Sequence, residues 1–137
     1  MSTMEEPFFT AAVSPNSKWQ CVFEDDGETG YLYLCHLLPN GDMEGIADAL
    51  WVYNQIVPPI TDCQEVFITW AEDSSRAALI VDDECWGMFD LQTKRKLEAE
   101  RKNNIIVPIS FETWEHGVKK DMGEELETTV QHEKQIF

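Results

Sequence analysis

The sequence predicts an α+β fold, an antiparallel sheet of about five or six strands with one main helix packed on one face. Two observations support this prediction. Short runs rich in aromatic and β-branched residues recur between turn-forming residues, at 18–23, 30–35, 65–70, 76–81 and 85–90. Between the second and third runs, residues 43–54 place Ile46, Leu50 and Tyr53 at the spacing of a helix face. The expected order is therefore a hairpin, a helix and a three-strand meander.

The first two runs are expected to form the hairpin. Residues 1–16 come before them as a leader ending in the turn-prone Ser14-Pro15-Asn16. Asp26-Gly27 lies between the runs and supplies the positive-φ residue that a tight connection needs. We therefore expect a single domain over residues 17–110, opened by this hairpin.

The helix is expected from about residue 43 to residue 54. Asp42 can cap its first turn, and Trp51 widens its apolar stripe enough for the helix to lie on a sheet. Pro58-Pro59 cannot continue a helix, so it should end near Asn54.

The last three runs are expected to form the antiparallel meander, because polar turns at 72–75 and 82–84 join them. After it, residues 94–102 hold five of the ten basic residues. The apolar run 105–109 contains a proline and suits an edge strand. Residues 111–137 are expected to be a polar C-terminal extension that is partly ordered.

The net charge limits the classes of partner that the protein is expected to bind. The chain has 137 residues and a formal charge of −16, from 26 acidic and 10 basic side chains. Such a charge steers a protein toward basic partners and disfavours nucleic acid and anionic membranes, although it can also serve solubility alone. No apolar run approaches the ~20 residues of a membrane span, and the start lacks a secretory signal, so a cytoplasmic location is expected.

The residue pattern contains no constellation typical of catalysis. The three histidines, His36, His116 and His132, do not accompany a nucleophile motif. The four cysteines are spread singly and are expected to be buried thiols, with a two-disulfide scaffold in an exported protein as the alternative. Neither cysteine nor histidine is paired at the spacing of a zinc site. We therefore expect no enzyme activity, no metal and no cofactor.

Two acidic clusters are the candidate partner-binding residues. Each lies at an expected turn, and the aromatic residues nearby could act as anchors of an interface or belong to the core. The candidates are Glu24, Asp25, Asp26, Glu28 and Tyr31 in the first cluster, and Asp82, Asp83, Glu84 and Trp86 in the second. Two alternatives stay open for the first cluster, a divalent-cation or acid/base site and a merely solvated hairpin tip.

The segments 23–31, 46–54 and 70–90 resemble an uncharacterised bacterial family of small acidic proteins, one of the domains of unknown function. The resemblance covers roughly residues 17–95 and implies no activity. In size, charge and layout the chain also resembles the immunity proteins encoded beside bacterial toxins, which block a toxin by plugging its active site. This second resemblance implies a cytoplasmic, antitoxin-like inhibitor that binds a cognate basic toxin domain.

Two rival functions remain at this stage. One is a small metal- or ligand-binding module, or an enzyme, that uses the carboxylates of residues 24–28 with a divalent ion. The other is a homodimer whose acidic surface matters only for solubility.

Overall fold

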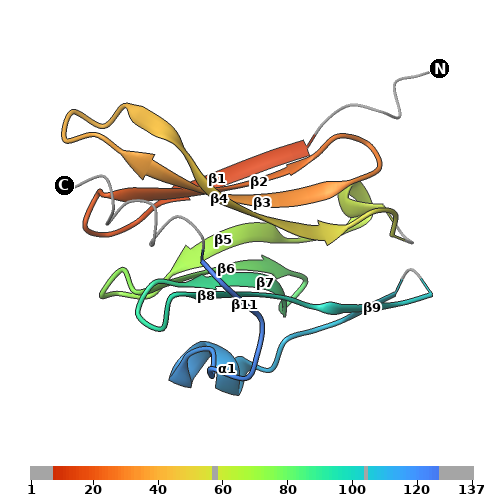
Figure 1. Ribbon diagram of the computed structural model, residues 1–137. Helices are drawn as coiled ribbons and strands as arrows, with labels where there is room; N and C mark the ends of the chain where they lie inside the picture. The colour runs from red at the N-terminus through yellow and green to blue at the C-terminus, as the bar shows by residue number, and fades with distance from the viewer. Residues whose placement is uncertain (1–7, 57–58, 104, 127–137) are drawn as a thin grey trace.

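The computed structural model describes residues 8–56, 59–103 and 105–126. Within these ranges eleven strands form three antiparallel sheets, and the larger two pack face to face as a sandwich (Figure 1). The first sheet has the order β1-β2-β3-β4. Its strands are β1 (Phe8–Val13), β2 (Trp19–Asp25), β3 (Gly30–Leu37) and β4 (Met43–Tyr53).

The second sheet has the order β11-β8-β7-β6-β5. Its strands are β5 (Val66–Trp70), β6 (Arg76–Val81), β7 (Glu84–Asp90), β8 (Arg95–Glu98) and β11 (Glu124–Glu125). A separate two-stranded ribbon pairs β9 (Glu100–Lys102) with β10 (Ile105–Val107). A short 3-10 helix, η2 (Ile60–Asp62), links the two large sheets, and α1 (Phe111–His116) lies on the outer face of the second sheet (Figure 1).

The expected α+β fold class is wrong, because the described residues are mostly β and the segment expected as the main helix is β4. The pairing of β4 with β3 shifts register between Gly30 and Tyr31 and again between Leu34 and Cys35. A register shift of this kind is a β-bulge, which breaks the period-two alternation of a strand. Val52 and Tyr53 are therefore both buried although they are neighbours in the strand. Because the alternation is broken, the apolar residues Ile46, Leu50 and Tyr53 recur at the spacing of a helix face.

The other expected strands are confirmed. Asp25 pairs with Gly30 at the end of the β2–β3 hairpin, and β5, β6 and β7 pair in sequence as a meander. The expected limits at residues 16 and 110 do not mark the limits of the fold. β1 lies within the expected leader, and Leu126 of the expected extension is buried in the core at 1% exposure. Residues 1–7 and 127–137 lie outside the described ranges.

The second sheet is apolar on both faces because it is covered on both. Between the sheets lies the main core, which includes Phe23, Leu32, Leu50, Leu79 and Phe89. A smaller cluster under α1 contains Ala78, Ile80, Cys85, Met88, Ala99, Ile109 and Val118. The four cysteines carry free thiols, three of them buried. Among the described residues no helix has the length and apolar character needed to cross a membrane.

Candidate functional site

The two acidic turns lie at the same end of the sandwich (Figure 1). Tyr53, at the end of β4, connects them. Its hydroxyl donates a hydrogen bond to the Asp25 carboxylate, and its ring meets the ring of Trp86 edge-on at a centroid distance of 6.0 Å. The sheets therefore bring together two clusters that are more than fifty residues apart in the sequence.

The first turn uses two of its carboxylates to hold its own shape. Asp25 is buried and accepts a hydrogen bond from the Gly27 N–H at 2.6 Å. Asp26 is exposed and accepts hydrogen bonds from the N–H groups of Thr29 and Glu28, which lower the pKa of the Asp26 carboxyl. Because Asp25 is also bonded to Tyr53, little of its side chain is left for a partner. Glu28 stays exposed at the tip.

The second turn is built in a similar way. Asp82 accepts hydrogen bonds at 2.8 Å from the N–H groups of Gln64 and Glu65, which fix the turn to the start of β5. Glu84 accepts a hydrogen bond from the indole N–H of Trp86 at 3.1 Å. Trp86 is only 8% exposed and belongs to the main core, so it is poorly placed to anchor a partner.

A row of exposed side chains crosses the outer face of the first sheet. Phe9 pairs with Glu24, Glu24 with Tyr31, and Tyr31 with Trp51, so these four residues lie side by side on four successive strands. Tyr33 lies next to Tyr31, and their rings stack at a centroid distance of 5.9 Å. We call these five residues the aromatic face.

Glu24 supplies the negative charge within this face. Burial and the nearby carboxylates, Glu24 first among them, raise the pKa of Tyr33. The rings nevertheless reach water, since Phe9 is 66% exposed and Trp51 is 42% exposed. The face thus combines wide aromatic surface with a carboxylate that lies between two of its rings.

Apolar side chains extend the aromatic face along the strands. Val13 and Ile46 are exposed at the two ends of a further cross-strand row of the same face. At the edge, the guanidinium of Arg101 stacks over Trp51 at 4.2 Å and donates a hydrogen bond to the Val52 carbonyl at 3.0 Å. Monomeric proteins rarely leave a contiguous apolar surface uncovered, and such surfaces mark interaction sites.

Sequence reasoning found Glu24 and Tyr31 but missed Phe9 and Tyr33. Phe9 fell within the expected leader, although the alternation of Phe9, Ala11 and Val13 was a usable strand signal. Only the pairing of the strands shows that these residues share a face with Glu24.

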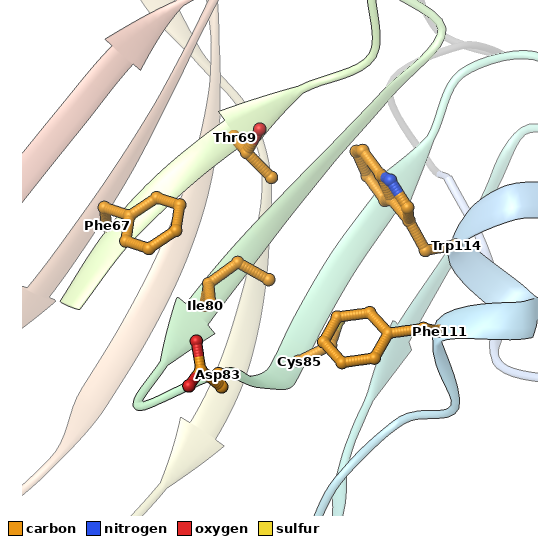
Figure 2. A pocket seen from close by; sticks show the side chains of 7 residues that line it. All are labelled: Phe67, Thr69, Ile80, Asp83, Cys85, Phe111 and Trp114. Carbon is orange, nitrogen blue, oxygen red and sulfur yellow. The ribbon is translucent and has the colours of Figure 1, made fainter. Parts of the chain in front are cut away.

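The described residues contain no group of three or more His, Cys, Asp or Glu side chains placed to hold a metal ion. A cavity of about 380 Å³ lies elsewhere, between α1 and the second sheet (Figure 2). It includes Asp83 but none of the aromatic face.

The family described as "Uncharacterized protein conserved in bacteria (DUF2251)" matches residues 2–130. The resemblance to an uncharacterised bacterial family is thereby confirmed, over more of the chain than residues 17–95. No curated protein and no solved structure matches the sequence.

Proposed function

Since the chain belongs to this uncharacterised bacterial family, we propose its function from its surface: it is a non-enzymatic, immunity-type inhibitor that binds a basic toxin domain in the cytoplasm. The observation that carries the proposal is the aromatic face. The rings of Phe9 and Tyr31 flank Glu24 on the neighbouring strands of an open sheet, and Tyr33 and Trp51 lie beside Tyr31.

The aromatic rings would supply the binding energy. Tyr and Trp are enriched among the few residues that dominate protein interfaces, because they bury a large rigid area at a small cost in side-chain entropy. Tyr31 and Tyr33 are already stacked on each other, which fixes their orientation before a partner arrives.

The charge would select the partner. Glu24 lies within the face, and Asp26 and Glu28 lie at its end, next to the β2–β3 turn. With a net charge of −16 the whole chain attracts a basic protein and speeds its association. The same charge repels nucleic acid, anionic membranes and a second copy of the chain, which makes the homodimer the weaker alternative.

The rival metal-binding function has less support. Two of the four carboxylates that it needs, those of Asp25 and Asp26, accept hydrogen bonds from backbone N–H groups of their own turn. Both oxygens of Asp25 already accept hydrogen bonds, from the Gly27 N–H and the Tyr53 hydroxyl, so a divalent cation would have to compete with these bonds for that carboxylate.

Affinity capture from the native bacterium tests the proposal, with the tagged full chain as bait and washes of low and high salt. A second bait carries Phe9→Ser and Tyr31→Ser, which remove two exposed rings from the aromatic face. The matched control carries Ile105→Ser, which removes an exposed apolar side chain from β10, outside the aromatic face.

We expect the wild-type and Ile105→Ser baits to retain one basic protein that the double variant loses, and that protein should arrest growth when it is produced alone. With the purified pair, Glu24→Gln together with Glu28→Gln should slow association and weaken its dependence on salt. An empty column at low salt, or equal retention by the double variant, would overturn the proposal.

A further inference from the structure

A second candidate site lies between the outer face of the second sheet and α1. The cavity of about 380 Å³ is lined by residues from β5, β6, the β6–β7 turn, the start of β7 and α1. These are Phe67, Thr69, Ile80, Asp83, Cys85, Phe111 and Trp114 (Figure 2). Its volume falls within the range of small-molecule sites, about 300–1,000 Å³.

Aromatic rings form the walls of the cavity. Phe67 lies on one side, and Phe111 and Trp114 from α1 lie on the other (Figure 2). Phe67 and Phe111 remain 42% and 50% exposed, so their surfaces are available to a ligand. The arrangement is held in place, because the Ser110 hydroxyl caps α1 and the guanidinium of Arg76 lies 5.8 Å from the Trp114 ring.

The cavity has few polar groups, and these differ in charge and exposure. Asp83 is the only charged side chain among the lining residues, and it is exposed at one end. Cys85 is buried, and burial raises the pKa of its thiol to about 11, so the thiol is protonated at neutral pH and acts as an apolar floor. Thr69 contributes a hydroxyl on the side opposite Asp83 (Figure 2).

We propose that this cavity binds an organic cation, an amine with an aromatic or alkyl body. The ammonium lies beside the Asp83 carboxylate, and the body lies between Phe67 and the rings of α1. The electron-rich faces of aromatic rings attract cations, and the carboxylate adds a charge of the right sign. An anion of the same shape meets repulsion, and a neutral isostere loses both attractions. This inference does not depend on the proposed toxin-binding function.

The charge requirement is tested by titrating the full chain with three ligands of one shape at constant ionic strength. These are phenethylammonium, 2-phenylethanol and phenylacetate, followed by nuclear magnetic resonance of the indole N–H groups. Trp114→Phe assigns the Trp114 signal. We expect phenethylammonium to shift this signal and to bind about threefold more tightly than the alcohol, as for a partly exposed ion pair. Phenylacetate should bind most weakly.

Asp83→Asn tests the carboxylate, and asparagine suits the site because Asp83 has a φ of 69°. The variant should bind the cation less tightly than the wild type does, because only the attraction of the rings remains, while its affinity for the alcohol stays unchanged. Glu28→Gln is the matched control, since it removes one exposed carboxylate outside the cavity. No shift of the Trp114 signal at millimolar ligand, or equal affinities for all three ligands, would overturn the proposal.

The same chemistry could come from a free amine or from a lysine of another protein. Titration with N-acetyl-lysine methylamide separates these sources, because its body is alkyl and flanked by peptide groups. If phenethylammonium binds more tightly, the ligand of the cavity is a small aromatic amine. If the lysine derivative binds more tightly, the ligand is a lysine side chain of another protein. Either result supports a cation site at Asp83.

Discussion

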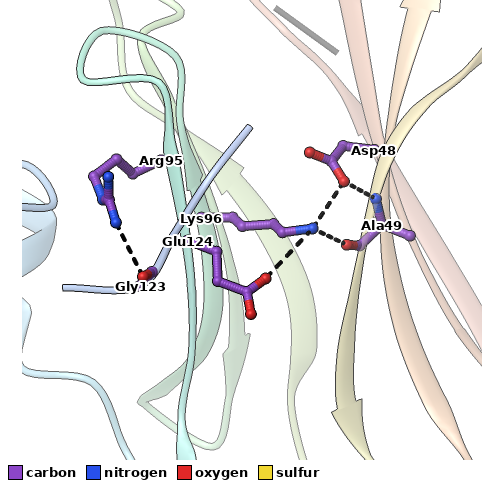
Figure 3. A network of polar contacts seen from close by, with 6 residues as sticks. All are labelled: Asp48, Ala49, Arg95, Lys96, Gly123 and Glu124. Carbon is purple, nitrogen blue, oxygen red and sulfur yellow. Dashed lines mark hydrogen bonds and ion pairs between the residues drawn. The ribbon is translucent and has the colours of Figure 1, made fainter. Parts of the chain in front are cut away.

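Lys96 of β8 forms an ion pair with Asp48 of β4 at 2.9 Å, and the two side chains are only 11% and 6% exposed (Figure 3). The Lys96 ammonium also donates a hydrogen bond to the Ala49 carbonyl at 2.9 Å. The contact joins the two large sheets of the sandwich across one side. A charge buried in this way is stable only with its partner, because desolvation costs about as much as the pairing returns.

Lys96→Met should therefore destabilise the protein, because it leaves the Asp48 carboxylate buried without its ion pair. We expect the free energy of unfolding to fall by about 3 kcal/mol, as for other broken buried pairs. Urea denaturation measures it. Lys120→Met, at an exposed position, is the control and should change stability by less than about 0.5 kcal/mol. Similar stabilities for the two variants would show that the ion pair contributes little.

Asp90→Ala should loosen the C-terminal segment. Asp90 is fully buried, and its carboxylate accepts hydrogen bonds from the N–H groups of Gln92, Thr93 and Val118. Its removal leaves the buried N–H of Val118 unpaired and takes away the partner of two part-buried N–H groups, at an expected cost of about 2–3 kcal/mol. Hydrogen exchange of residues 117–126 should quicken at the same time.

The control for Asp90 is Asp73→Ala. Asp73 also accepts a hydrogen bond from a backbone N–H two residues later, that of Ser75, but it is exposed. Its loss should destabilise the protein much less than the loss of Asp90, because water replaces the missing partner. Equal losses for the two variants would contradict the role of burial.

The parts of the fold that could be predicted are those set by local sequence. The turn at Asp26-Gly27 and the alternating runs around it specify the β2–β3 hairpin within about twenty residues. Residues 43–54 were expected to be a helix, and the irregular pairing of β4 explains why this expectation was wrong. Its bulges place both Val52 and Tyr53 in the core, and no local rule separates that pattern from a helix stripe.

The candidate site depended on pairings that are not local. Glu24 and Tyr31 were found because both flank one turn, whereas Phe9 joins them only through β1. Asp25 and Trp86 were chosen as partner-binding residues, and the structure buries both. Asp25 is covered because Tyr53, 28 residues later, bonds to it. The sequence of the turn alone does not show which of its carboxylates will accept a hydrogen bond from a distant tyrosine.

Gly123→Ala should detach the end of the described chain from β8. Gly123 has a φ of 65°, and an added Cβ would lie 2.1 Å from the carbonyl oxygen of Lys96. The same backbone carries two carbonyls, of Met122 and Gly123, that accept hydrogen bonds from the Arg95 guanidinium. We expect a loss of at least about 3 kcal/mol, the sum of conformational strain and a backbone clash.

Gly41→Ala is the matched control, because Gly41 also has a positive φ, of 94°, but nothing lies within 4 Å of an added Cβ. It should cost only about 1 kcal/mol, the strain of the left-handed region. Hydrogen exchange of residues 122–126 should quicken in Gly123→Ala and stay unchanged in Gly41→Ala. Equal stability losses would mean that the chain near Gly123 shifts away from Lys96 at no cost.

The stability of the protein should fall in alkaline solution. Burial raises the pKa of Cys85 to about 11, and burial also raises the pKa of Cys21. In the unfolded chain a thiol ionises near pH 8.5. Between these values the unfolded state has lost protons that the folded state keeps, so rising pH favours unfolding.

Urea denaturation at pH 7 to 10.5 measures this effect. Below pH 8.5 the thiols add no pH dependence, and above it each one lowers the free energy of unfolding by about 1.4 kcal/mol per pH unit. Cys85→Ala removes one of these groups, so its stability should fall less steeply between pH 9 and 10.5, although its stability at pH 7 drops because a buried side chain is smaller. Parallel curves for the variant and the wild type would show that the Cys85 thiol ionises as readily in the folded protein as in the unfolded chain.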